Sequence, residues 1–278
     1  MATLTIEPGV EVRFEKGTGL YMGKPHSSYS WLAYWGALSV QGTVDNPVVF
    51  TSNATAPGLA DWKGIYFRKW TGGSQSLLQH CVIEYGGHTH NANLYMDQAS
   101  VPIRDSVIRH SGGHGAYLSS SGAAVTNTMI SGNQLNGLYL ASSSSTIAEN
   151  SISGNQNHGI YCDGSSSASL KDNIISHNGQ SAINVNANRV KHLRGNSGTG
   201  NGQNYIQVRG GNISSSGTWT KQGLAYVITG DITVRHSSYA NSDSYLATLT
   251  IEPGVEVRFE TGTGLYIGKP HSSYRVDA

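Results

Sequence analysis

Residues 115–162 read GAYLSSSGAAVTNTMISGNQLNGLYLASSSSTIAENSISGNQNHGIYC, and this stretch decides the fold. The tetrapeptide GAYL at 115–118 returns as GLYL at 137–140 and as GIYC at 159–162, at steps of 22 residues. Related tetrapeptides lie before and after at similar steps, namely GIYF at 64–67, NLYM at 93–96, AINV at 182–185 and YIQV at 205–208. A period of this length is typical of a repeat architecture.

Each period also carries two further apolar columns. One column is Ile103, Val125, Ile147 and Leu170, and the other is Ile108, Ile130, Ile152 and Ile175. The apolar segments are too short for helices and alternate with period two, which is typical of β-strands. Three strands per coil of 22–23 residues predict an all-β fold, a right-handed parallel β-helix (solenoid). We expect its core to contain Ile130, Leu138, Leu140, Ile152 and Ile160.

The turns between the strands repeat as well. Asn133, Asn155 and Asn178 recur at steps of 22 and 23 residues, next to glycines. Asparagine tolerates left-handed backbone conformations, and its side-chain amide can bond to an asparagine stacked above it. We therefore predict an asparagine ladder at one corner of the solenoid. Between Asn186 and Asn204 the pattern does not set the register.

Several longer segments carry a family resemblance. They are LTIEPGVEVRF at 4–14, GALSVQGTVDNPVVFTSN at 36–53, WKGIYF at 62–67 and HCVIEYGG at 80–87, together with the GIY-type coils. Across roughly residues 2–275 the chain resembles the large parallel β-helix repeat family of bacterial surface and secreted proteins, whose architecture is pectate-lyase-like. The resemblance implies a right-handed parallel β-helix. It does not choose a function, because lyases, epimerases, adhesins and phage spikes share this architecture.

A second, longer repeat spans the chain. Residues 2–29 return at 247–274, an offset of 245, and differ only at Lys16/Thr261 and Met22/Ile267. We expect one continuous β-helix over residues 1–278, made of a repeat unit (2–246) and the start of the next copy (247–275). With Met1 as the first residue, the first coil would present an unpaired strand edge, which is a template for strand addition. We therefore predict head-to-tail association with other copies of the chain, which can propagate as a filament.

Composition narrows the function classes. Charged residues make up 13% of the chain, against about 25% in typical globular domains. Because 18 Lys and Arg balance 17 Asp and Glu, we expect no nucleic-acid partner. No apolar run is long enough to cross a bilayer, so we expect no membrane insertion. Cys81 and Cys162 fall at inward positions and are expected to be buried free thiols.

The clearest surface feature is a tyrosine column. If Leu138 and Leu140 point inward, the tyrosine between them points outward, because successive strand residues face opposite ways. The column consists of Tyr66, Tyr95, Tyr117, Tyr139 and Tyr161, with Tyr21 and Tyr266 in the matching slot of the two copies. Such a stripe could stack on the sugar rings of a polysaccharide, or it could be a ladder that stabilises the sheet. The sequence leaves both readings open.

A histidine cluster is the other candidate site. His88 and His90 lie in a coil of 25 rather than 22 residues, and His110 and His114 follow one coil later. Imidazoles can bind a metal, but this spacing matches no strong metal motif, so solvated histidines are the favoured reading. Three pairs of neighbouring charges are the nearest match to lyase machinery, namely Arg68 and Lys69, Arg104 and Asp105, and Lys171 and Asp172. None forms an acidic calcium cluster, so we expect no cofactor and assign no catalytic residue.

Two functional hypotheses follow from these patterns. The favoured one is a structural or adhesive segment of a long extracellular or cell-surface tandem-repeat protein, which joins end to end. The alternative is a carbohydrate-binding or carbohydrate-active β-helix, such as a polysaccharide lyase or hydrolase, that uses the tyrosine stripe. Whether the chain is an enzyme stays open, although the near-identical second copy favours a structural role.

Overall fold

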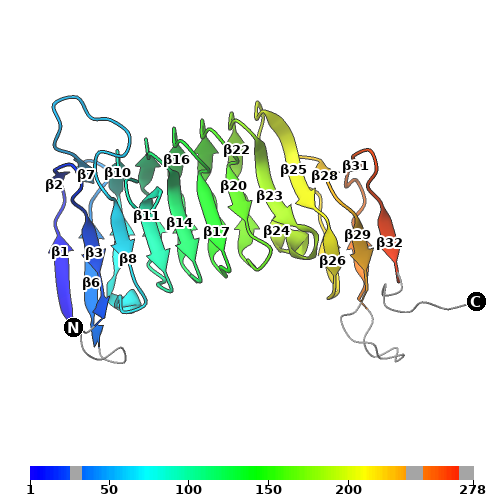
Figure 1. The fold of residues 1–278 in the computed structure, drawn as a ribbon, viewed down its shortest axis with the longest axis horizontal. Coiled ribbons are helices and arrows are strands. Elements are labelled where there is room, and N and C mark those ends of the chain that lie inside the picture. The colour runs from blue at the N-terminus through cyan, green and yellow to red at the C-terminus, as the bar shows by residue number, and fades with distance from the viewer. Residues whose placement is uncertain (26–32, 236–246, 269–278) are drawn as a thin grey trace, which may run out of the picture.

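The chain is a rod of stacked coils (Figure 1), seen here in a computed structural model that describes residues 1–25, 33–235 and 247–268. Short parallel strands pair from coil to coil and build long sheets along the rod. Each coil of the main body passes through three sheets in turn, as the sequence period predicts. The predicted right-handed parallel β-helix is therefore confirmed.

Three sheets form the body of the rod. Sheet 1 is made of β1 (Ala2–Ile6), β6 (Gly36–Gln41), β9 (Leu77–Gln79), β12 (Ile103–Arg104), β15 (Ala124–Thr126), β18 (Thr146–Ala148), β21 (Ser169–Lys171) and β24 (Leu193–Arg194). Sheet 2 is made of β2 (Glu11–Phe14), β7 (Val48–Ser52), β10 (Cys81–Glu84), β13 (Val107–Arg109), β16 (Met129–Ser131), β19 (Ser151–Ser153) and β22 (Ile174–Ser176). Sheet 3 is made of β3 (Leu20–Met22), β8 (Ile65–Phe67), β11 (Ala92–Asp97), β14 (His114–Ser119), β17 (Leu138–Ala141), β20 (Ile160–Cys162), β23 (Ser181–Asn186), β25 (Gln203–Arg209), β28 (Tyr226–Ile228) and β31 (Val257–Phe259).

Smaller elements complete the rod. Sheet 4 contains β26 (Gly211–Ile213), β29 (Ile232–Val234) and β32 (Leu265–Ile267), and sheet 5 contains β27 (Gly217–Trp219) and β30 (Leu249–Ile251). Strands β4 (Lys24–Pro25) and β5 (Ala33–Tyr34) pair antiparallel beside the first coil. In the described ranges, two 3-10 helices, η1 (Gly73–Gln75) and η2 (Ala187–His192), lie between strands.

The core is one continuous apolar column inside the coils. The side chains of Ile130, Leu138, Leu140, Ile152 and Ile160 are fully buried, as predicted. The two further apolar columns, which begin at Ile103 and Ile108, are buried in the same way. Both cysteines are buried and unpaired, and burial raises the pKa of each thiol to about 12. Among the described residues, no helix has both the length and the apolarity that a membrane crossing requires.

The predicted asparagine ladder is present at the corner between sheets 2 and 3. The Nδ2 of Asn133 donates to Oδ1 of Asn155 (2.7 Å), and the Nδ2 of Asn155 donates to Oδ1 of Asn178 (2.8 Å). The ladder continues to Asn201 at 3.0 Å. These asparagines do not take the left-handed conformation, which falls on the residue before each of them, Gly132, Gly154 and His177. Their side chains therefore serve the amide ladder and its hydrogen bonds to the neighbouring backbone, and not a left-handed turn.

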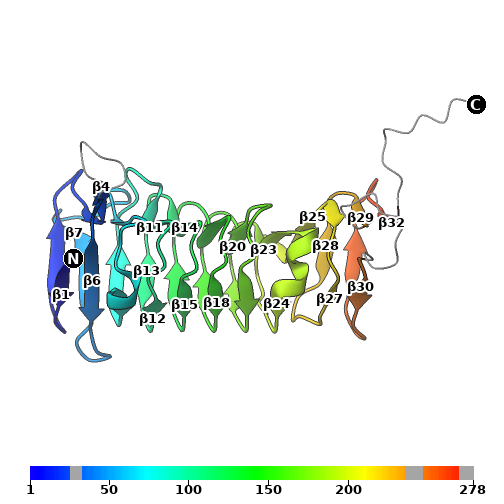
Figure 2. The ribbon, with the colours of Figure 1, turned by 90° about the horizontal axis from the view of Figure 1, so that it is seen from below.

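The solenoid changes its cross-section near its C-terminal end. Helix η2 follows β23. In the next coil, strands β26 and β27 pack against η2 (Figure 2). Sheet 5 continues from sheet 1, since the hydroxyl of Thr220 donates to the carbonyl of Leu193 in β24 (3.0 Å). Sheet 2 ends with β22, apart from a single bridge between Ile174 and Ser197. From here the coils pass through sheets 3, 4 and 5.

This change places the two sequence copies on different faces. In the first copy, β1, β2 and β3 lie in sheets 1, 2 and 3. In the second copy, the equivalent strands β30, β31 and β32 lie in sheets 5, 3 and 4. Tyr266 therefore pairs with Thr233 in sheet 4 and does not extend the tyrosine column of sheet 3. The rest of the second copy, residues 269–275, lies outside the described residues.

Candidate functional site

The predicted tyrosine column exists on the outer face of sheet 3. The strand register places Tyr21, Tyr66, Tyr95, Tyr117, Tyr139 and Tyr161 opposite one another in consecutive coils. We call these residues the tyrosine ladder. Ring centroids lie 6.0 Å apart at the first step, between Tyr21 and Tyr66, and 4.6–5.1 Å apart at the later steps. Most steps are edge-to-face or tilted, and the last, from Tyr139 to Tyr161, is stacked with an interplanar angle of 19°.

The ladder is half-buried rather than flat against solvent. Its inner members are of intermediate exposure, and the first, Tyr21, is 41% exposed. Burial raises the pKa of Tyr66, Tyr95, Tyr117 and Tyr139 above the usual phenol value, so these rings stay neutral. Edge-to-face and offset pairs at these separations stabilise by about 0.5–1.5 kcal/mol each beyond their buried area. The ring pairs of the ladder therefore have a geometry that stabilises the contact between consecutive coils.

Histidines flank the ladder on one side. His90 packs between Tyr66 and Tyr95, with centroids 4.4 and 5.1 Å away. His114 lies 5.0 Å from Tyr139, and His158 lies 5.7 Å from Tyr161. Burial lowers the pKa of His114 and of His158 to about 4. Both imidazoles are therefore neutral at pH 7 and act as packing and hydrogen-bonding groups.

The four histidines that the sequence groups together are not assembled into one site, and the expectation that they are solvated is wrong for His114, which is 7% exposed. His90 and His114 lie beside the tyrosine ladder, as described above. His88 is exposed, and its Nδ1 lies 3.5 Å from the hydroxyl of Thr89. His110 packs on Tyr85 at the corner between sheets 2 and 3. Over the described part of the chain, no three His, Cys, Asp or Glu side chains gather as a metal site would require.

Near each end of the ladder, an arginine side chain packs over a tyrosine ring. The guanidinium of Arg68 lies over the ring of Tyr66 at 4.9 Å, and that of Arg209 lies over Tyr161 at 4.8 Å. Arg209 also donates to the hydroxyl of Tyr161 and to the carbonyl of Cys162. Beyond Tyr161 the column continues with Asn184 and Gln207, so the aromatic stretch ends there.

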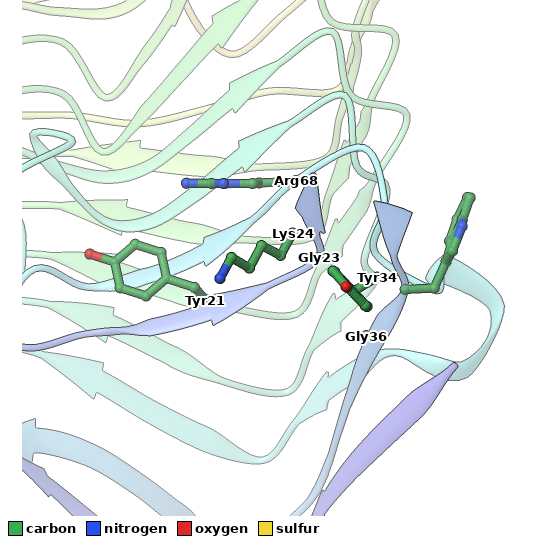
Figure 3. A pocket seen from close by; sticks show the side chains of 7 residues that line it. Tyr21, Gly23, Lys24, Tyr34, Gly36 and Arg68 are labelled. Carbon is green, nitrogen blue, oxygen red and sulfur yellow. The ribbon is translucent and has the colours of Figure 1, made fainter. Parts of the chain in front are cut away.

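A pocket of about 520 Å³ lies at the N-terminal end of the ladder. It is lined by Tyr21, Lys24, Tyr34, Trp35 and Arg68, with Gly23 and Gly36. Figure 3 shows the side chains of Tyr21, Lys24 and Arg68 projecting on the same side of the strands. Tyr34 and Trp35 are 60% and 50% exposed, which is high for such large aromatic rings. The pocket therefore combines aromatic faces with two positive charges.

Comparison with known families agrees with this architecture. A family model described as a right handed beta helix region matches residues 64–238, well over half of the chain. The chain belongs to the right-handed β-helix family. No curated protein and no solved structure matches it.

The three charge pairs that the sequence compares with lyase chemistry are not brought together in this β-helix. Arg68 and Lys69 lie over aromatic rings, Tyr66 and Trp70 respectively. Arg104 donates to the side-chain oxygen of Gln79 (2.9 Å). Lys171 and Asp172 form an exposed ion pair with each other at 3.4 Å. These charges are spread over three coils and face different neighbours.

The β-helix also holds site residues that the tyrosine pattern did not reveal. His158 stands three residues before Tyr161, as His114 stands three before Tyr117, so the 22-residue step could have found it. Arg209, Lys24, Tyr34 and Trp35 follow no such period. Their positions depend on the β4–β5 hairpin and on the long strand β25, which the sequence does not place in register.

Proposed function

We propose that this chain is a structural or adhesive segment of an extracellular tandem-repeat protein. The observation that carries the proposal is the placement of the second copy. Its strands β30, β31 and β32 pair in parallel with β27, β28 and β29 and form the next coil of the same rod. A repeat that begins again without interrupting the solenoid suits a protein that gains length and surface by adding units.

The tyrosine ladder supports the same role. Its rings pack on one another and on His90, His114 and His158, so most of their faces are already used within the chain. A platform for sugars would need free, coplanar ring faces. The ladder instead ties consecutive coils of sheet 3 together.

We expect the double substitution Tyr117→Ala and Tyr139→Ala to destabilise the fold. It removes three ring pairs of the ladder and two ring contacts of His114. At about 0.5–1.5 kcal/mol for each aromatic pair, in addition to lost burial, the loss should be about 2–4 kcal/mol. Thermal and urea unfolding measure it. Tyr21→Ala is the matched control, because Tyr21 has one ladder neighbour and is more exposed, so its effect should be smaller. An unchanged melting temperature in the double variant would contradict a structural ladder.

A second candidate function rests on the pocket at the end of the ladder. Trp35, which is 50% exposed, offers a ring face, and Lys24 and Arg68 offer positive charge, a combination that suits an acidic polysaccharide. This site lies beside the ladder and does not require its inner rings.

Polygalacturonate is a suitable probe for this second function. If the pocket binds it, Trp35→Ala and Lys24→Ala should each weaken binding about tenfold, the change produced by the loss of one good contact. Lys171→Ala is the control, because Lys171 is an exposed lysine on a distant coil of sheet 1. Affinity electrophoresis at two salt concentrations measures the effect, since screening should weaken a charge-dependent site. Equal binding by all three variants would remove the pocket as the site.

A further inference from the structure

The positive charges of this chain are unevenly distributed. Residues 173–230 contain no Asp or Glu, although the whole sequence has 17 of them. The same stretch contains several cationic residues, namely Arg189, Lys191, Arg194, Arg209 and Lys221. The near-neutral balance of the whole sequence therefore hides a positively charged region towards the C-terminal part of the rod.

Three of these cations lie together on η2 and on the strand that follows it. Arg189 and Lys191 belong to η2, and Arg194 belongs to β24. We call these three residues the basic patch. Burial lowers the pKa of His192, which lies between them in the sequence, and the positive charges of the patch lower it further. The imidazole is therefore neutral at pH 7, and the charge of the patch comes from its three long side chains.

Within residues 1–25, 33–235 and 247–268, no ion pair joins the basic patch to an acidic side chain. Nζ of Lys191 donates instead to the hydroxyl of Ser215 (2.7 Å). The guanidinium of Arg194 donates to the carbonyl of Leu193 (3.3 Å). Nε of Arg189 is enclosed and has no hydrogen-bond partner. The patch thus concentrates positive charge that the described part of the chain does not neutralise.

A neighbouring lysine adds to the repulsion at the patch. Lys171 in β21 lies directly opposite Arg194 in the strand register. Like charges directly opposite each other on neighbouring strands destabilise a sheet. Asp172 pairs with Lys171 at 3.4 Å, but both side chains are about half exposed, and exposed ion pairs of this kind contribute little. An anion from outside the chain would relieve the repulsion at Arg194.

We propose that the basic patch binds a sulfated polysaccharide. The inference rests on the proposed adhesive role and names the partner of that role. Arginine presents its N–H donors as a planar fork, which matches the oxygens of an oxyanion. Because one sugar ring can carry more than one sulfate ester, a short stretch of such a polymer matches three cations placed within residues 189–194.

The surroundings of the patch suit sugars better than nucleobases. Exposed Ser215 and half-buried Asn188 add hydroxyl and amide groups, which form hydrogen bonds with sugar hydroxyls. Sites for single-stranded nucleic acid use aromatic rings on which bases stack. The aromatic residues of β27 and β28, Trp219 and Tyr226, are only 3% and 1% exposed, so they offer no ring face. The observations therefore favour a polysaccharide over a nucleic acid.

The basic patch is separate from the pocket at the N-terminal end of the tyrosine ladder. Strand β24 is the last strand of sheet 1 and lies well towards the C-terminal end of the rod (Figure 2), whereas the pocket lies beside β3 and β8. In the proposed tandem array, the patch would recur once in each 245-residue unit. One polysaccharide chain could then contact several patches and gain affinity without any new kind of contact.

Titration with fluorescently labelled dextran sulfate tests the patch. K191Q and R194Q should each weaken binding about tenfold, and the double variant at least about thirtyfold. Glutamine keeps a donor for Ser215, so the melting temperature should stay within about 2 °C of the unsubstituted chain. K24Q is the control, because Lys24 is a cation of the N-terminal pocket, and it should change affinity by less than about twofold. Equal losses in K24Q and in K191Q/R194Q, or a double variant that binds normally, would overturn the proposal.

Salt dependence and a second polymer identify the chemistry of the ligand. Direct contacts between cations and a polyanion release counterions, so the slope of log affinity against log salt should become shallower by about 1.5 in K191Q/R194Q. Oligothymidylate with the same number of charges should bind at least about tenfold more weakly than dextran sulfate, because the patch offers no ring for its bases. Neutral dextran should not bind.

Oligothymidylate that binds as tightly as dextran sulfate would overturn the assignment to a polysaccharide. An unsubstituted chain that does not bind dextran sulfate at low salt would overturn the patch as a site. Either result would leave the scaffold role standing, because that role is tested by the unfolding of the ladder variants. A destabilised ladder variant that still binds dextran sulfate would support both proposals.

Discussion

Lowering the pH from about 7 to about 4.5 should cost this protein several kcal/mol of stability through two buried histidines. The pKa of both His114 and His158 is lowered from 6.5 to about 4, chiefly by burial. Between these values the unfolded chain binds more protons than the folded one, so stability falls as the pH drops from 6.5 and levels off below about 4. Because one pKa unit corresponds to about 1.4 kcal/mol, each imidazole contributes about 3 kcal/mol to the loss.

Burial is the main reason why both imidazoles stay neutral, and for His114 a hydrogen bond acts in the same direction. Nδ1 of His114 accepts from the backbone N–H of Asn136 (3.2 Å), so a proton on this nitrogen would break the bond. His158 contacts the hydroxyl of Ser181 through Nδ1 (2.7 Å). Burial lowers the pKa of His158, a hydrogen bond to the backbone of Ser181 raises it, and the guanidinium of Arg209 lowers it again. Both histidines are less than a tenth exposed, so solvent screens these effects little.

The chain supplies its own conservative replacement for the test. His114, Asn136 and His158 form one column at steps of 22 residues, with Asn136 between the histidines. The double variant H114N/H158N should therefore keep the turn and lose most of the pH dependence in urea unfolding. H177N is the control, because His177 is exposed and its left-handed backbone suits asparagine. A stability profile that is equally steep in H114N/H158N and in the unsubstituted chain would contradict this assignment.

Much of the fold follows from the sequence because one period sets both strand register and burial. The alternation around Leu138, Tyr139 and Leu140 fixes which side chains face inward. Each stacked coil repeats this alternation in the same register. The columns at Ile130 and Ile152 and the amide ladder follow in the same way. The prediction failed for Tyr266 because its register depends on the cross-section of the coil before it. That cross-section changes at η2, inside the stretch where the pattern set no register.

The candidate site is less predictable for a related reason. The regular spacing of tyrosines in the sequence predicts a column. Whether the rings of that column stack flat or edge-to-face depends on which side chains pack between them. His90, His114 and His158 fill that space, and Arg68 and Arg209 cover rings near the ends. The pocket is formed by the β4–β5 hairpin, whose two-residue strands carry no periodic signal. The spacing between repeats predicts the column of tyrosines. Only the packing of the side chains shows that most of the tyrosine ring faces already contact other residues of the chain.

Replacement of Asn155 by alanine should be among the most damaging single substitutions in the chain. Its Oδ1 accepts from the backbone N–H and from Nδ2 of Asn133, at 3.2 and 2.7 Å. Its own Nδ2 donates to the carbonyl of Ile130 (3.3 Å) and to Oδ1 of Asn178 (2.8 Å). The site is 1% exposed, so water cannot take over these bonds in place of the amide. At about 1–3 kcal/mol for each buried group left unpaired, the loss should reach about 3–5 kcal/mol.

Two comparisons show whether the amide itself is responsible. Gln156→Ala, at the adjacent exposed position, should change stability by less than about 0.5 kcal/mol. Asn155→Asp keeps the volume and the acceptor oxygen but turns the donor into a second acceptor, which would face the carbonyl of Ile130 and Oδ1 of Asn178. Aspartate should therefore be at least as destabilising as alanine at pH 7. If aspartate were tolerated, packing volume rather than the ladder would hold this corner. If both were costly, the stacked amides would be what keeps consecutive coils in register between sheets 2 and 3.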